Sequence, residues 1–111
     1  MQDRELLELA AKAAGLQINR RAQAERDALI DPTTASLWIN SESTAWNPLR
    51  DNGPALRLAV KLNIRFSGEW NGASVALHGV QEFHESNGDD PCAATRRAIV
   101  RAAAEIGKAT P

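Results

Sequence analysis

Residues 90–107 read DPCAATRRAIVRAAAEIG and predict the longest helix of the chain. Asp90 supplies an N-cap side chain, and Pro91 suits the first helical position, where its missing N–H costs no hydrogen bond. Gly107 suits the residue that ends the helix. Apolar residues recur between them at helical spacing, and the predicted inward stripe consists of Ile99, Val100, Ala102, Ala103 and Ile106.

Asn71-Gly72, upstream of this helix, is the strongest hairpin signal in the sequence, because both residues tolerate the positive φ of a type I′ turn. A strand beginning at Ile64 precedes the turn. The strand that follows, over about 73–84, alternates in polarity, and we expect a bulge at Gly79. Val75, Leu77 and Phe83 are predicted on one face of it, with Ala76, His78, Val80, Glu82 and His84 on the other.

Two further helices are predicted earlier in the chain. Residues 3–14 form the first, capped by Asp3 and ended by Gly15. The second begins at Pro54 and ends at Asn63. In this second helix the residues predicted to face inward are Leu56, Ala59, Val60 and Leu62, with Arg57 and Lys61 on the solvent side.

The region between these helices is harder to assign. Leu16 to Ile18 looks like the start of a strand, and residues 36–40 alternate well enough for another. Residues 19–35 fit either a short helix ending near Ile30 or a strand running into a long loop. A turn signal stands at 31–34.

These elements predict one α+β domain over residues 1–111, because the chain is too short for two cores. The expected order is α-β-β-α-β-β-α, a small two-layer domain. About three helices would pack on one face of a mostly antiparallel sheet of roughly three to four strands. Alanine buries little area per residue, so we expect stability to depend on closely packed helices.

Composition narrows the function classes. The chain has 13 Lys and Arg against 14 Asp and Glu, which lacks the basic excess of a general nucleic-acid binder. The single cysteine, Cys92, cannot form an internal disulfide and suits a reducing compartment. No apolar run approaches the roughly 20 residues needed to cross a bilayer, and no signal core follows the N-terminus. We therefore expect a cytoplasmic protein without a membrane partner.

Histidine and cysteine supply the candidates for chemistry. His78, Glu82 and His84 share one face of the predicted strand, but zinc sites draw ligands from several elements at defined spacing. Cys92, in the first helical turn, would be a nucleophile only if His78 or His84 acted as its base. Solvated histidines and a packed cysteine are the more common roles. We predict no metal, no cofactor and no catalytic residue, which favours a protein that is not an enzyme.

Three arginines, Arg96, Arg97 and Arg101, crowd the last helix. Glu105 follows Arg101 by one turn, so a self-compensated solvated face is one interpretation. In the other, the guanidinium groups bind phosphates or a carboxylate-rich protein surface, since their planar donors suit bidentate pairing.

Two tryptophans complete the candidate binding residues. Trp46 either fills the end of the core or anchors a partner, because exposed tryptophans are enriched at interface hot spots. Trp70 stands beside the predicted turn, where a large aromatic side chain would be partly exposed. The predicted binding set is therefore Arg96, Arg97, Arg101, Trp46 and Trp70.

Two stretches resemble the NinX-type proteins, short proteins of unknown function encoded in tailed-phage and prophage genomes of proteobacteria. They are WNPLRDNG at 46–53, running on into ALRLAVKL at 55–62, and the stretch at 90–107 already quoted. The opening helix is also similar, whereas 17–44 and 64–85 match poorly. The resemblance implies an accessory phage protein acting inside a bacterial cell and supplies no chemistry.

The sequence thus favours a small module that binds a host or phage protein, with inhibition of a host or defence factor as one form of that role. Nucleic-acid binding through the arginine face of the last helix is the alternative function. A symmetric homodimer is also open, because small alanine-rich helices often pack across a two-fold axis. The sequence specifies neither the partner nor the oligomeric state.

Overall fold

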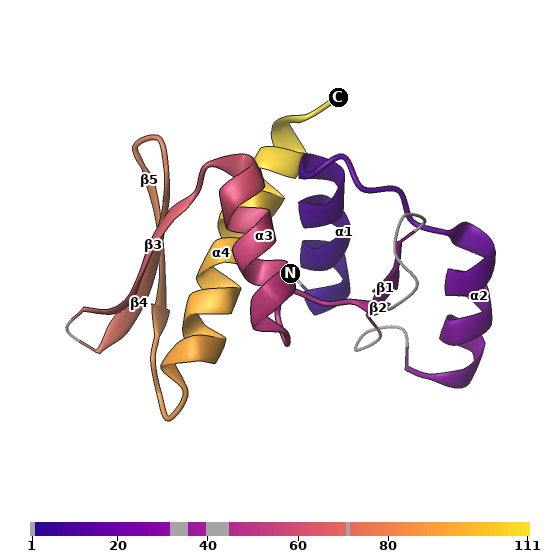
Figure 1. Ribbon diagram of the computed structural model, residues 1–111, viewed down its shortest axis with the longest axis horizontal. Helices are drawn as coiled ribbons and strands as arrows, with labels where there is room; N and C mark the ends of the chain where they lie inside the picture. The colour runs from indigo at the N-terminus through magenta and orange to yellow at the C-terminus, as the bar shows by residue number, and fades with distance from the viewer. Residues whose placement is uncertain (1, 32–35, 40–44, 71) are drawn as a thin grey trace.

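The computed structural model describes residues 2–31, 36–39, 45–70 and 72–111, without the side chains of Glu69 and Trp70. This part of the chain forms four helices and two antiparallel sheets, which confirms the α+β class. Helix α4 lies between the larger sheet on one side and α1 and α3 on the other (Figure 1). The helices are α1 (Asp3–Ala13), α2 (Arg20–Leu29), α3 (Asn52–Leu62) and α4 (Pro91–Ala109), and the strands are β1 (Leu37–Trp38), β2 (Ala45–Trp46), β3 (Arg65–Trp70), β4 (Ala73–His78) and β5 (Gln81–Ser86).

Helix α4 begins as predicted and ends later than predicted. The Asp90 carboxylate accepts a hydrogen bond from the Ala93 N–H at 3.0 Å, and Pro91 is the first helical residue. Gly107 does not end the helix, which continues to Ala109. A Cβ atom on Gly107 would lie 2.1 Å from the carbonyl oxygen of Leu9 in α1. Gly107 is therefore the point where the two backbones touch, and not a helix stop.

Helices α1 and α4 pack against each other, and most of their buried residues are alanine or glycine. Alanine and glycine let two helices approach closely, so that dispersion contacts between the backbones add to those of the few large side chains. Ile106, predicted within the inward stripe, is only half-buried. The buried residues are Leu6, Leu7, Ala10 and Ala11 in α1 and Ala94, Ala98, Ile99, Val100, Ala102, Ala103, Ala104 and Gly107 in α4.

The C-terminal end of α1 is as predicted, whereas its N-terminal end is not. Gly15 has a φ of +72°, and the Leu16 N–H donates to the Ala11 carbonyl at 2.9 Å, which closes the helix with a Schellman motif. The N-cap is Gln2, without a side-chain hydrogen bond, so the predicted cap at Asp3 is wrong. Asp3 is the first helical residue instead and is used in a contact with α4.

The predicted strand over 73–84 is two strands, β4 and β5, which form a hairpin. Gly79, with a φ of +61°, turns the chain instead of forming a bulge, and Val80 beside it is 98% exposed. Val75, Leu77 and Phe83 are all odd-numbered, so the polarity pattern gives no sign of the turn, although a two-residue turn shifts the facing of the side chains by one position. The predicted faces are consequently wrong, because Ala76 pairs with Phe83 and both are buried. Together with β3 these strands form a sheet of order β3-β4-β5. In the hairpin between β3 and β4, Gly72 has the predicted positive φ, at +78°. Asn71 lies outside the described residues.

Between Leu16 and Trp46, the described residues form α2 and a separate small sheet, so the single predicted sheet is wrong. Of the two interpretations of 19–35, the short helix is confirmed. The predicted strand at 16–18 is reduced to one bridge between Ile18 and Ile39, and β1 is shorter than 36–40. Strand β1 pairs with β2 in an antiparallel way. Residues 32–34 of the predicted turn lie outside the described residues.

Helix α2 is attached to the body mainly through polar contacts. Its buried side chain is Gln23, whose amide nitrogen donates to the Ser36 carbonyl at 3.3 Å while its oxygen accepts from the Trp38 N–H at 2.7 Å. Arg4 of α1 donates twice to the Asp27 carboxylate, at 3.1 and 3.0 Å. These hydrogen bonds lower the pKa of Asp27 and raise that of Arg4.

Gly107→Ala should destabilise the fold, because the added Cβ meets backbone that cannot move aside. We expect the free energy of unfolding to fall by about 1–3 kcal/mol or more. Urea unfolding followed by circular dichroism measures it. Gly53→Ala is the matched control, since its Cβ would meet only the mobile end of Arg57, and alanine should stabilise α3 by up to about 1 kcal/mol. Equal stability of the two variants would contradict the close α1–α4 contact.

Asp27→Asn should lower stability at neutral pH and matter less in acid. A carboxylate with a lowered folded pKa contributes stability that is complete above its ordinary pKa of about 3.9 and is lost as the pH falls through the folded value. The difference in unfolding free energy between wild type and Asp27→Asn should therefore shrink from pH 7 toward pH 2. Glu25→Gln, on the exposed face of α2, is the control. A difference that does not change with pH would rule out the proposed role of the Arg4–Asp27 pair.

Candidate functional site

Helix α3 exposes two apolar side chains that the sequence predicted to be buried. Leu56 is 53% exposed and Val60 is 74% exposed, whereas Ala55, Leu58 and Ala59 face the core. The helix also begins at Asn52, two residues before Pro54. Its sequence contains two apolar stripes at i,i+4 spacing, and only packing against α4 decides which of them is buried. The second stripe is left on the surface.

Leu56 lies on the wall of a groove of about 580 Å³ between α3, β3 and the first half of α4. Phe66, which is 43% exposed, contributes from β3 on the opposite wall. A concave, mainly apolar hollow of this size is typical of a binding site. We call it the apolar groove, and its walls include Ala55, Leu56, Phe66, Cys92, Thr95 and Ile99.

A second hollow of about 350 Å³ opens where the start of α1, the turn before α3 and the first half of α4 meet. It is lined by Asp3 and three arginines, Arg50, Arg96 and Arg97, and we call it the arginine hollow. Arg96 also lines the apolar groove, so the two hollows are neighbours with one side chain in common.

The arginines of this hollow have two kinds of acceptor, because Arg96 donates to neutral oxygens whereas Arg97 and Arg50 donate to carboxylates. Arg96 donates to two neutral oxygens, the Leu49 carbonyl at 2.9 Å and the Asn52 side chain at 2.7 Å. Arg97 donates to the Asp3 carboxylate at 2.8 Å. Arg50 is hydrogen-bonded to Asp51, which raises the pKa of its guanidinium. Arg96 and Arg97 are therefore positioned by residues distant in the chain, whereas Arg50 pairs with its neighbour Asp51 and is exposed.

Arg101, the third arginine predicted to bind, lies apart from this hollow. Its guanidinium pairs with the Glu85 carboxylate, donates to the His84 carbonyl at 2.9 Å and lies 5.8 Å from the Phe83 ring centroid. Glu105, the expected partner, pairs instead with Lys108 at 2.9 Å. The predicted arginine face is thus divided, because Arg96 and Arg97 line the arginine hollow whereas Arg101 contacts β5.

The two tryptophans of the predicted binding set have different positions. Trp46 belongs to β2 and is 3% exposed, so of its two proposed roles the structure favours that of a core residue. Trp70 ends β3, and its side chain lies outside the described part of the chain. The predicted site residues did not include four that line the two hollows: Asp3, Arg50, Leu56 and Phe66.

The histidines do not form the face predicted for them. His78 pairs with Gln81 and His84 pairs with Val75, and alternation along the hairpin places the two histidines on opposite faces of the sheet. Cys92 is exposed on the apolar groove, which neither histidine lines. Within the described residues, no group of three or more His, Cys, Asp and Glu side chains is placed to hold a metal ion.

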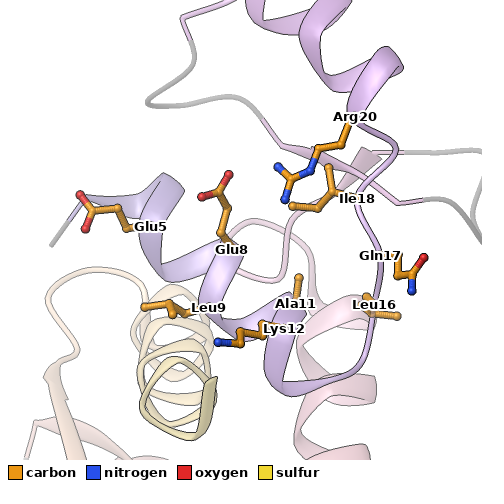
Figure 2. A pocket seen from close by; sticks show the side chains of 9 residues that line it. All are labelled: Glu5, Glu8, Leu9, Ala11, Lys12, Leu16, Gln17, Ile18 and Arg20. Atoms are coloured by element: carbon orange, nitrogen blue, oxygen red, sulfur yellow. The ribbon is translucent and has the colours of Figure 1, made fainter. Parts of the chain in front are cut away.

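A further hollow, of about 690 Å³, lies between α1 and residues 16–20. Figure 2 shows Glu5 and Glu8 extending from α1, with Arg20 reaching over Ile18 from the other side. Its lining balances two acidic side chains against Arg20 and Lys12. Neither the charge nor the shape of this hollow favours one class of ligand.

No family model, curated protein or solved structure matches this chain. Among the helices of the described residues, none combines the length and the apolar character needed to cross a membrane. The candidate site is therefore interpreted from its own geometry.

Leu56→Asp should leave the fold intact, because its side chain is more than half exposed. We expect the free energy of unfolding to change by no more than about 0.5 kcal/mol, as at most surface positions. Leu58→Ala, two residues along the same helix, should cost about 2–5 kcal/mol because Leu58 is buried. Thermal unfolding of both variants checks the orientation of α3, and a larger loss for Leu56→Asp would show that the helix is rotated from the position described here.

Proposed function

We propose that this chain is a small protein-binding module whose apolar groove receives an apolar side chain from a segment of a partner protein. The proposal is supported above all by Leu56 and Phe66, two large apolar side chains that remain 53% and 43% exposed on the walls of one groove. Large apolar side chains gathered in an exposed concavity are typical of interaction sites, whereas those scattered singly need no explanation.

The size of the groove favours a side chain or short segment over a flat interface. At about 580 Å³ it is in the range of pockets that accept small molecules or a few side chains. Thr95 on its wall already donates to the Pro91 carbonyl at 2.7 Å, and Ile99, which also lines the groove, is buried. An apolar occupant would therefore displace water from surface that has few polar groups to satisfy.

The partner that we propose is a host or phage protein in the bacterial cytoplasm, in keeping with the resemblance to NinX-type phage proteins. Inhibition of a host or defence factor is one form that this binding would take. Nucleic-acid binding through the arginine face of α4 has weaker support. Two of its three arginines, Arg97 and Arg101, are each paired with a carboxylate and have less charge to offer phosphates.

Selection of peptides from a random 12-residue display library on the immobilised full chain tests the proposal. Selected peptides should bind wild type and lose about tenfold or more in affinity with Leu56→Asp, because a buried charge would face the apolar occupant. Val60→Asp is the matched control, since Val60 is exposed on the same helix but is not part of the groove wall. Equal affinity of the selected peptides for wild type and Leu56→Asp would overturn the proposal.

A further inference from the structure

We infer that the arginine hollow binds a carboxylate of the partner segment, so that the module recognises an acidic side chain close to an apolar one. The inference rests on the proposed function in one respect, because the partner segment that would carry the carboxylate is the one proposed to enter the apolar groove. The carboxylate site itself consists of residues outside the apolar part of the groove and is separately testable.

Arg96 has donors left for such a ligand. A guanidinium carries five N–H groups, and the two bonds of Arg96 to Leu49 and Asn52 use the Nε group and one on Nη1. Among the described residues, its Nη2 atom has no hydrogen-bond partner given by the structure. Because both existing acceptors are neutral, the positive charge of Arg96 is not balanced by a carboxylate in contact with it. A fixed planar guanidinium of this kind is suited to bidentate pairing with a carboxylate.

The contact between Arg97 and Asp3 shows that a carboxylate fits at the edge of this hollow. Asp3 lies 2.8 Å from Nη2 of Arg97, with about half of its side chain still exposed. The other nitrogens of the Arg97 guanidinium are not used in that bond. A second carboxylate placed in the hollow would meet Arg96 and Arg97, which are consecutive residues of α4.

The charge of the hollow favours a single carboxylate. Arg50, Arg96 and Arg97 bring three positive charges, and Asp3 on the wall and Asp51 paired to Arg50 bring two negative charges. One positive charge remains, which one carboxylate balances. A nucleic-acid backbone instead presents one negative charge about every 1.7 Å of duplex, and its neighbouring phosphates would be repelled by the two aspartates.

The position of Arg96 connects the carboxylate to the apolar occupant. Because Arg96 lines both hollows, a ligand group held by it lies next to whatever enters the apolar groove. The recognised segment therefore carries its acidic residue within a few positions of its apolar one. Two adjacent requirements of different chemistry would make recognition more selective than apolar burial alone.

Titration of the full chain with glutarate, followed through the arginine Nε–H signals by NMR at 150 mM salt, tests the carboxylate site. The Arg96 and Arg97 signals should shift in a saturable way. Affinity should fall about tenfold with Arg96→Gln and clearly with Arg50→Gln, an exposed residue whose loss does not threaten the fold. Arg57→Gln is the control, because Arg57 is exposed on α3 and lies outside this hollow.

Inorganic phosphate and a 12-nucleotide oligo-dT serve as competing probes in the same titration. Tighter binding of either one at Arg96 and Arg97 would overturn the assignment to a carboxylate, and so would non-saturable shifts spread over all arginines. Selected peptides should lose affinity with Arg96→Gln as well as with Leu56→Asp. If peptides bind through Leu56 without an acidic residue and without dependence on Arg96, the inference fails while the proposed function stands.

Discussion

The contact between Gly107 and the Leu9 carbonyl is the constraint on which the rest of the structure depends. It brings the backbones of α4 and α1 together at one end, while Asp3 meets Arg97 at the other, so the two helices run side by side in the same direction. The alanines between these points make a close interface with few large side chains. Since α4 also contacts α3 and all three strands of the larger sheet, its position determines where these elements lie (Figure 1).

The same helix builds both the core and the candidate site. One face of α4 consists mainly of small, buried residues. The first half of the helix also presents exposed or partly exposed side chains to the two hollows, namely Cys92, Thr95, Arg96 and Arg97. The start of α4 is held against the sheet by Ser74, a fully buried residue whose hydroxyl lies within hydrogen-bond distance of the Gly68 carbonyl and the Thr95 hydroxyl. A buried polar group with partners on two elements specifies their relative position. Ser74 thereby fixes the position of Thr95, which lies on the wall of the apolar groove.

Features determined by local chemistry were predictable from the sequence. The Asp90-Pro91 start of α4 and the left-handed glycines at 15 and 72 depend on their own backbone and immediate neighbours. Gly107 was misinterpreted because a glycine near a helix end looks the same whether it ends the helix or lets another backbone approach. The two apolar stripes of α3 were equally ambiguous, and packing against α4 resolved them. Gly79 marks a turn that polarity alternation does not register.

The candidate site depends mainly on contacts between distant residues, and these were not predictable. Arg96 and Arg97 were identified as binding candidates from their residue type alone. Their partners Asp3 and Leu49 come from other elements, with Asp3 94 residues away along the chain. No local pattern connects such residues. The exposure of Leu56 likewise follows from the rotation of a helix about its axis, which is a tertiary property.

The most direct test of the account is to follow the backbone amide signals of the ¹⁵N-labelled chain while adding a peptide selected for binding to it. The account predicts that the perturbed amides cluster on the N-terminal half of α3, on β3 and on the first half of α4, around Arg96. Perturbations confined to the outer face of the larger sheet, or to the hollow between α1 and residues 16–20, would contradict it.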